Sequence, residues 1–256
     1  MLGAIIGDTI GSVYEFNPVK HTNFELFSDK SGCTDDSVLT VAVAKAILTG
    51  TPYEEHIRDF GLRYFDGGYG LMFKQWLLSE DPKPYNSFGN GSAMRVSPVG
   101  FAFNTIEEVL NEAKKSAECT HNHPEGIKGA QATALVIFMG RTGSSKDEIK
   151  KEIVERFGYD LSRTIDEVRE TSFFNETCQG TVPESIIAFL DSTDYESAIR
   201  NAISLGADAD TNAAITGSMA EAFYKEIPET LIRETYNRMP TEFIDIVSEF
   251  NKRYFE

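Results

Sequence analysis

The chain has 256 residues, of which 41% are hydrophobic, and it carries a formal net charge of −16 at pH 7. A chain of this size and composition can bury one large core, and no linker-like stretch divides it, so we expect a single domain over residues 1–256. The negative charge argues against nucleic acid as a partner, because a nucleic-acid binder needs a positive surface to neutralise phosphates. A phosphate-containing small molecule stays possible where bound divalent cations change the local field.

The sequence also bears on where the protein works. No apolar run is long enough to span a bilayer, and the first residues lack the basic region that opens a secretory signal. Three cysteines at unrelated spacings are typical of free thiols in a reducing compartment. We therefore expect a cytoplasmic protein, without membrane contact, and a monomer.

The chain opens with a helix-like stretch of small residues. Gly3, Gly7 and Gly11 recur every four residues, which indicates a helix face that packs closely against a neighbour. Glu15 follows at the expected end of this helix, where a carboxylate meets the negative end of the helix dipole. Either solvent exposure or a functional role would explain a residue in that unfavourable place.

Irregular and helical segments alternate in the first half of the chain. Residues 17–32 have no periodic pattern, and the helical spacing of apolar residues from Val38 to Ile47 then predicts a helix that stops at Gly50. Residues 66–91 are rich in glycine and proline and are predicted to be irregular. Long loops in a compact domain are often functional lids or binding loops.

Helix signals continue to the C-terminus. Ser/Thr–x–x–Glu capping boxes predict helices that begin near Thr105, Ser145 and Thr181, with Pro183 in the first turn of the third. Further helices are predicted from Asp194 to Gly206 and over residues 241–254. Because alternating strand patterns are nearly absent, the sequence predicts an all-α fold.

Two segments between these helices carry groups suited to anions. Gly89-Asn90-Gly91-Ser92-Ala93-Met94-Arg95 is a glycine-rich turn whose free backbone N–H groups could hold phosphate oxygens. In His121-Asn122-His123-Pro124, a histidine at a helix start could donate to a phosphate. Structural alternatives exist for both: an ion pair for Arg95, and a cap and turn for the histidines.

The most informative feature is a pair of acidic clusters far apart in the chain. They are Thr34-Asp35-Asp36 and Asp208-Ala209-Asp210-Thr211, each at the start of an apolar, helix-like run. Their carboxylates and hydroxyls suit Mg²⁺, Mn²⁺ or Ca²⁺ and suit Zn²⁺ poorly. If the fold brings the clusters together, the sequence predicts a two-metal site.

Simpler interpretations of the clusters must be weighed. Either cluster alone could be an ordinary helix cap. The second resembles the start of an EF-hand loop, but the sixth loop position is Ala213 instead of Gly and the twelfth is Met219 instead of Glu, so that interpretation fails. Two histidines at i and i+2 without a third soft ligand also make a zinc site a poor fit.

Taken together and in order, these segments resemble the ADP-ribosylglycohydrolase family, which includes the dinitrogenase reductase-activating glycohydrolases. The resemblance extends over residues 3–217 and rests on five segments: residues 3–8 with Glu15, 34–37, 89–95, 123–126 and 206–211. It implies a compact orthogonal helical bundle and two Mg²⁺ ions, with Mn²⁺ as a possible substitute. It also implies hydrolysis of the bond that joins ADP-ribose to an acceptor, which is an ADP-ribosylated protein or a small ADP-ribose conjugate.

The resemblance also implies roles for individual residues. The metal ligands would be Thr34, Asp35, Asp36, Asp208, Asp210 and Thr211. Glu15, Asp35 and Asp210 would carry the catalysis, with Glu15 as an acid/base or metal-linked carboxylate. Asn90, Gly91, Ser92, Met94 and His123 would bind the diphosphate and distal ribose. One departure is Ala207, which replaces a glycine common in the second cluster.

Two rival functions remain at this point. A prenyl-transfer enzyme is disfavoured, because residues 35–39 read Asp-Asp-Ser-Val-Leu where such enzymes usually have Asp-Asp-x-x-Asp. A non-catalytic ADP-ribose-binding or structural protein on the same fold stays open, because intact metal ligands are necessary for activity and not sufficient.

Overall fold

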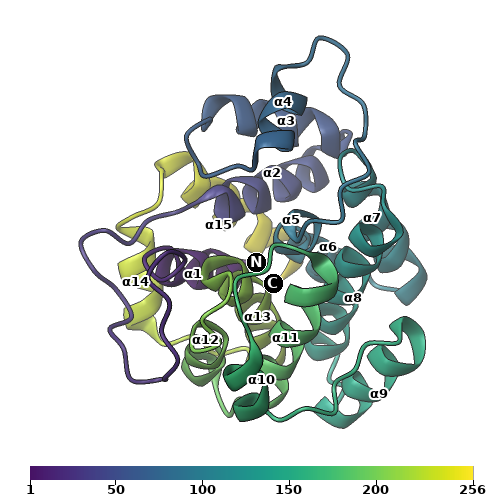
Figure 1. The fold of residues 1–256 in the computed structure, drawn as a ribbon. Coiled ribbons are helices and arrows are strands. Elements are labelled where there is room, and N and C mark those ends of the chain that lie inside the picture. The colour runs from purple at the N-terminus through teal and green to yellow at the C-terminus, as the bar shows by residue number, and fades with distance from the viewer. Residues whose placement is uncertain (256) are drawn as a thin grey trace.

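The protein, seen here in a computed structural model that describes residues 1–255, is built from helices (Figure 1). In the first half of the chain these are α1 (Leu2–Gly11), α2 (Asp35–Thr49), α3 (Tyr53–Arg63), α4 (Leu71–Leu78), α5 (Gly91–Met94), α6 (Ser97–Ala102), α7 (Ile106–Glu118) and α8 (Pro124–Arg141). The second half contains α9 (Lys146–Phe157), α10 (Ile165–Thr171), α11 (Cys178–Leu190), α12 (Tyr195–Ile203), α13 (Ala209–Tyr224), α14 (Glu229–Tyr236) and α15 (Thr241–Tyr254). Among the described residues, the only β-type pairing is a bridge between Gly89 and Thr177. The predicted all-α fold is confirmed.

Helix α13 forms the centre of the domain. Its residues from Ala209 to Ala222 are all buried, and it packs against α1, α8, α11 and α12 (Figure 1). These helices share one hydrophobic core, which is the reason a helix of small, weakly amphipathic residues is stable here.

Helices α1 and α13 approach each other more closely than helices with ordinary side chains could. A Cβ atom on Gly7 would lie 2.1 Å from the carbonyl oxygen of Ala213, and one on Gly11 would lie 2.5 Å from the Cα of Asp210. The glycines therefore serve the close packing that their spacing predicted. This contact fixes the start of α13 beside α1.

Two features of the helices differ from the sequence-based expectation. Residues 66–91 are not wholly irregular, because Phe73, Trp76 and Leu77 bury one face of the short helix α4. The helical spacing of these three apolar residues is short, and the glycines and prolines around it made the whole segment look irregular in the sequence.

The second difference concerns the start of α11. Thr177, not Thr181, caps this helix by accepting a hydrogen bond from the Gly180 N–H. Pro183 consequently lies inside the helix instead of in its first turn, where it removes one intrahelical hydrogen bond. The Thr181 hydroxyl donates to the Asn175 carbonyl.

The other capping signals agree with the structure. Thr105 and Ser145 form capping boxes with Glu108 and Glu148, and Gly50 ends α2 in the left-handed conformation. No helix of the described residues is long and apolar enough to cross a membrane.

Candidate metal centre and ligand cavity

The first acidic cluster occupies the start of α2. The Thr34 hydroxyl caps the helix by accepting from the Asp36 N–H at 3.3 Å, and the Asp35 N–H donates to the Gly67 carbonyl at 2.7 Å. Asp35 and Asp36 therefore lie in the first helical turn, where the partial positive charge of the helix end favours carboxylates.

The second cluster occupies the start of α13. Asp208 is the residue before the helix, and Asp210 lies in its first turn. The Asn90 side-chain amide donates to the Asp208 carboxylate at 2.7 Å, and the Thr211 N–H donates to the Asp210 carboxylate at 2.9 Å. These contacts fix the direction of both carboxylates.

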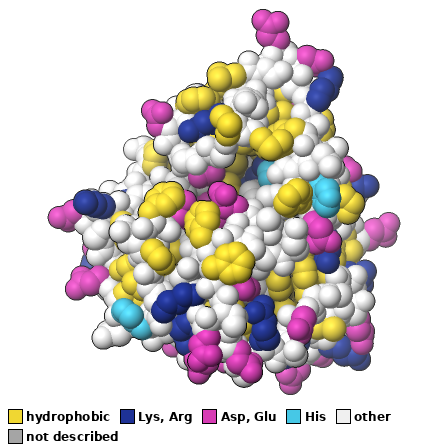
Figure 2. Space-filling view, in the orientation of Figure 1, with side chains coloured by type: hydrophobic (Ala, Val, Ile, Leu, Met, Phe, Trp, Pro, Cys, Tyr) yellow, Lys and Arg dark blue, Asp and Glu magenta, His cyan; other side chains and the backbone are white. Residues whose placement is uncertain are grey.

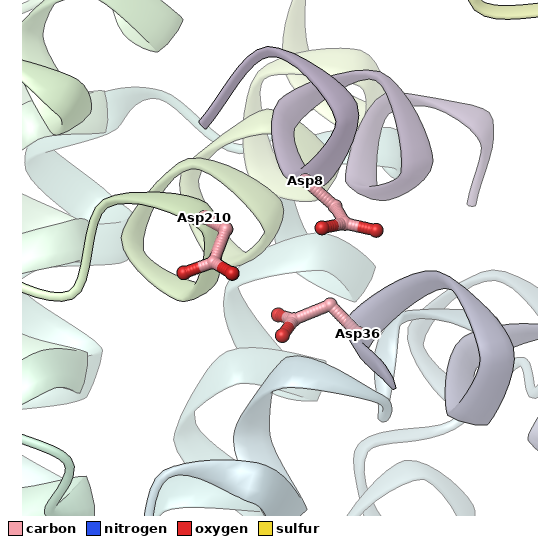
Figure 3. A group of neighbouring side chains, drawn as sticks. All are labelled: Asp8, Asp36 and Asp210. Atoms are coloured by element: carbon pink, nitrogen blue, oxygen red, sulfur yellow. The ribbon is translucent and has the colours of Figure 1, made fainter. Parts of the chain in front are cut away.

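The fold brings the two clusters together. Carboxylate oxygens of Asp36 and Asp210 lie within 4.8 Å of each other and of an oxygen of Asp8, and the three side chains point from three helices into one space (Figure 3). A second group of the same tightness joins Glu15, Asp208 and Asp210. Asp210 belongs to both groups.

Asp8 is a site residue that the sequence analysis did not single out. It is fully buried in α1 and accepts hydrogen bonds from the Thr34 N–H at 3.0 Å and the Thr34 hydroxyl at 2.6 Å, and from the N–H and hydroxyl of Ser37. Asp8 thus ties α1 to the start of α2. The available signal was a lone aspartate within a helix of otherwise small and apolar residues.

The cluster gathers several buried carboxylates in one place. Burial raises the pKa of Asp35, Asp36 and Asp210 well above the usual range, and the neighbouring carboxylates raise it further. Burial also raises the pKa of Asp208 to about 6. In residues 1–255, no ion pair involves these four side chains.

One atom of the cluster has no partner at all. The buried Oδ1 of Asp36 accepts no hydrogen bond, although its Oδ2 accepts one from the Thr211 hydroxyl at 3.3 Å. A buried carboxylate oxygen without a donor is costly, and a bound cation would remove that cost. Because all the ligands are oxygens, the residues fit a hard divalent cation and do not fit zinc.

Glu15 differs from the aspartates in being half-exposed. It lies in the turn after α1, and partial burial raises its pKa to about 7, helped by the charges of Asp210, Glu176 and Asp8. A carboxyl group with a pKa near neutrality can hold or release a proton at physiological pH.

A cavity of about 320 Å³ opens directly onto the acidic groups. Figure 2 shows the opening as a hollow with magenta carboxylates at its base. Its lining includes Glu15, Asp35, Asp36, Asp208, Asp210 and Thr211, together with Asn90, Gly91 and Met94 from the glycine-rich turn. The volume is within the range of small-molecule sites.

Two predicted ligand-binding residues do not line this cavity. Ser92 is fully buried and its hydroxyl donates to the Gly126 carbonyl at 2.7 Å. The His123 ring caps α8 by accepting from the Glu125 N–H, and it packs against Phe88 with the ring centres 5.3 Å apart.

His121 takes the place by the glycine-rich turn that the sequence analysis gave to His123. It lines the cavity, and a Cβ atom on Gly91 would lie 3.2 Å from its Nε2 atom. Burial and the nearby Arg95 lower the pKa of His121 well below its usual value, so the ring is neutral at pH 7. The pair His121 and His123 was visible in the sequence, but spacing alone did not tell which ring faces inward.

Arg95, the last residue of the glycine-rich turn, is fully buried. Its Nη2 donates to the Ser116 carbonyl at 2.9 Å and to the Thr120 hydroxyl at 2.8 Å, while Nε and Nη1 have no partner. These two contacts anchor the turn against the end of α7 by hydrogen bonds, and among the described residues Arg95 does not form the ion pair that was considered for it.

Known proteins are similar to this chain in sequence or in fold. ADP-ribosylhydrolase ARH3 of Mus musculus is 24% identical over 312 residues, covering 90% of this chain and 84% of that protein. ADP-ribosylarginine hydrolase Tri1 of Pseudomonas putida is 23% identical, covering 88% of this chain and 69% of that protein. A solved structure described as an ADP-ribosylglycohydrolase-related protein complex superposes with a TM-score of 0.75 at 24% identity, over 99% of this chain and 95% of that one.

One protein family as a whole also matches this chain. The family model described as ADP-ribosylglycohydrolase matches residues 1–255, which include both acidic clusters, the glycine-rich turn and all of the cavity lining. The chain therefore belongs to the ADP-ribosylglycohydrolase family.

Proposed function

We propose that this protein is a Mg²⁺-dependent hydrolase that cleaves the glycosidic bond between ADP-ribose and an acceptor. The observation that carries this proposal is the convergence of carboxylates from the starts of α2 and α13, together with Glu15 from the turn after α1, on one cavity. Membership of the ADP-ribosylglycohydrolase family supplies the class of substrate.

The protein would hold two Mg²⁺ ions, for which Mn²⁺ could substitute. Their ligands would be Thr34, Asp35, Asp36, Asp208, Asp210 and Thr211, and Asp210 would bridge the two positions because it belongs to both carboxylate groups. Bound Mg²⁺ supplies charge stabilisation and lowers the pKa of water. Asp8 is a positioning residue in this proposal, since its oxygens already accept hydrogen bonds from Thr34 and Ser37.

The remaining site residues would bind the ligand and handle a proton. Glu15 would take a proton from water at the cavity base, a role that suits its raised pKa. Cleavage at the anomeric carbon builds positive charge on the sugar, which Asp35 and Asp210 would stabilise. The backbone of Asn90, Gly91 and Met94 would line the diphosphate and distal ribose.

The two histidines and Ser92 take different parts in the proposal. His121 would donate to the diphosphate, since its ring lies beside Gly91 in the cavity lining. His123 stays a second candidate for that contact at the edge of the site. Ser92 would hold the turn in place through its hydrogen bond to Gly126.

Turnover assays on defined substrates test this function. The purified protein is incubated with ADP-ribosylated arginine, ADP-ribosylated serine and an acetylated ADP-ribose, each with Mg²⁺ and with EDTA, and released ADP-ribose is quantified. We expect Mg²⁺-dependent release from at least one substrate and none with Asp36→Asn. If calorimetry detects ADP-ribose binding while no substrate is cleaved, the non-catalytic binding function is correct instead.

A further inference from the structure

The mouth of the cavity is surrounded by apolar side chains that no part of the described chain covers. The three most exposed large hydrophobic residues are Phe16 at 77%, Leu71 at 73% and Phe173 at 70%. Leu71 lines the cavity, Phe16 follows the lining residue Glu15, and Phe173 lies three positions before the lining residue Glu176. In Figure 2, hydrophobic side chains surround the acidic hollow.

Exposed apolar side chains gathered at one place mark an interaction site more often than scattered ones do. Here they come from three separate segments: the turn after α1, the start of α4 and the loop between α10 and α11. Met72 adds a fourth exposed apolar side chain beside Leu71, at 54%. We call Phe16, Leu71, Met72, Phe173 and Glu176 the rim.

The charge at the mouth favours a positively charged partner. Two divalent cations and the Arg95 guanidinium, which also lines the cavity, would supply five positive charges, whereas Asp8, Glu15 and the four aspartates of the clusters supply up to six negative ones. Glu176 adds one more at the cavity edge, where it is exposed and forms no ion pair within residues 1–255. The mouth therefore stays negative even when the metal positions are filled.

We infer that the rim is the docking surface for a polypeptide acceptor that carries a basic residue and apolar residues next to its ADP-ribosylated side chain. This inference rests on the proposed function and selects a protein over a small ADP-ribose conjugate. A cavity of about 320 Å³ has room for one small ligand, so the acceptor backbone has to lie outside, across the rim. Apolar acceptor residues then cover Phe16, Leu71 and Phe173, and the basic residue pairs with Glu176.

The test compares two synthetic ADP-ribosylated peptides with a small ADP-ribose conjugate of the same linkage. One peptide has leucine and lysine beside the modified residue, and the other has serine and glutamate. We expect the first peptide to have a KM about tenfold lower than the other two substrates. Phe16→Ser combined with Phe173→Ser should raise that KM about tenfold with kcat unchanged, and should leave the small conjugate unaffected.

Further variants separate docking from other effects. Glu176→Lys should reverse the preference between the two peptides, and Val154→Ser, an exposed apolar site on α9 away from the cavity lining, should change nothing. Equal KM values for all substrates in the wild type, with no effect of the double variant, would overturn the docking surface and leave the proposed function intact. Absence of turnover on every substrate would instead overturn the proposed function and the inference with it. A dimer that dissociates in the double variant would show that a second copy covers the rim, which also overturns the inference.

Discussion

Replacing Asp208 with asparagine should make the metal-free protein more stable, although the wild-type residue is a proposed metal ligand. Burial raises the pKa of Asp208 to about 6, compared with an ordinary value of 3.8. A carboxyl group whose pKa is higher in the native than in the unfolded protein does not destabilise the native state at pH values below its unfolded pKa, because it is protonated in both states. The loss of folding stability grows as pH rises from about 4 to 6, and it is constant at higher pH.

The size of the effect follows from the shift. A difference of about two pKa units corresponds to roughly 3 kcal/mol at pH 8. For a protein of this length, that free energy corresponds to an increase in Tm of roughly 6–12 °C. Asparagine keeps the shape of the side chain, and its carbonyl oxygen can still accept the hydrogen bond from Asn90.

Thermal unfolding of wild type and Asp208→Asn in EDTA at pH 4 and pH 8 measures this difference. The variant should melt higher at pH 8, and the two proteins should converge near pH 4. Addition of Mg²⁺ should raise the Tm of the wild type more than that of the variant, since a ligand that binds only the native state stabilises it. Asp29→Asn, at an exposed site, is the matched control.

The opposite result would refute the electrostatic reasoning. If metal-free Asp208→Asn melts at or below the wild type at pH 8 while Asp29→Asn is unchanged, the Asp208 charge does not destabilise the native state. The cluster would then be compensated within the protein and would have no need of a cation.

Three further predictions concern the metals, the proton and the scaffold. Asp36→Asn and Asp210→Asn should each abolish turnover and weaken Mg²⁺ binding by calorimetry at least tenfold, and unchanged affinity in both would contradict a shared site. Glu15→Gln should lower turnover by roughly 10²–10⁴-fold, with little change in ADP-ribose affinity; wild-type turnover would exclude its acid/base role. Gly7→Ala should destabilise the protein by roughly 1–3 kcal/mol in urea unfolding, because the new Cβ meets the Ala213 carbonyl, and an unchanged midpoint would contradict the close approach of α1 and α13.

Local patterns in the sequence determined most of the helices. Capping boxes such as Thr105 with Glu108, and glycine stops such as Gly50, depend only on neighbours a few residues away, so they can be recognised from the sequence alone. The same rule failed at Thr181, because a second threonine, Thr177, lies one turn earlier and caps the helix, while the Thr181 hydroxyl donates to the Asn175 carbonyl.

Tertiary structure decided how the site is assembled. The sequence contained both acidic clusters, but the glycine contact between α1 and α13 places Asp210 beside Asp8, and the hydrogen bonds of Asp8 to Thr34 and Ser37 bring Asp36 to the same place. Tertiary packing also decided which histidine lines the cavity, since His121 faces it whereas His123 caps α8 and packs against Phe88. Sequence patterns specify which chemical groups a segment offers, whereas packing over long chain separations decides which of those groups meet.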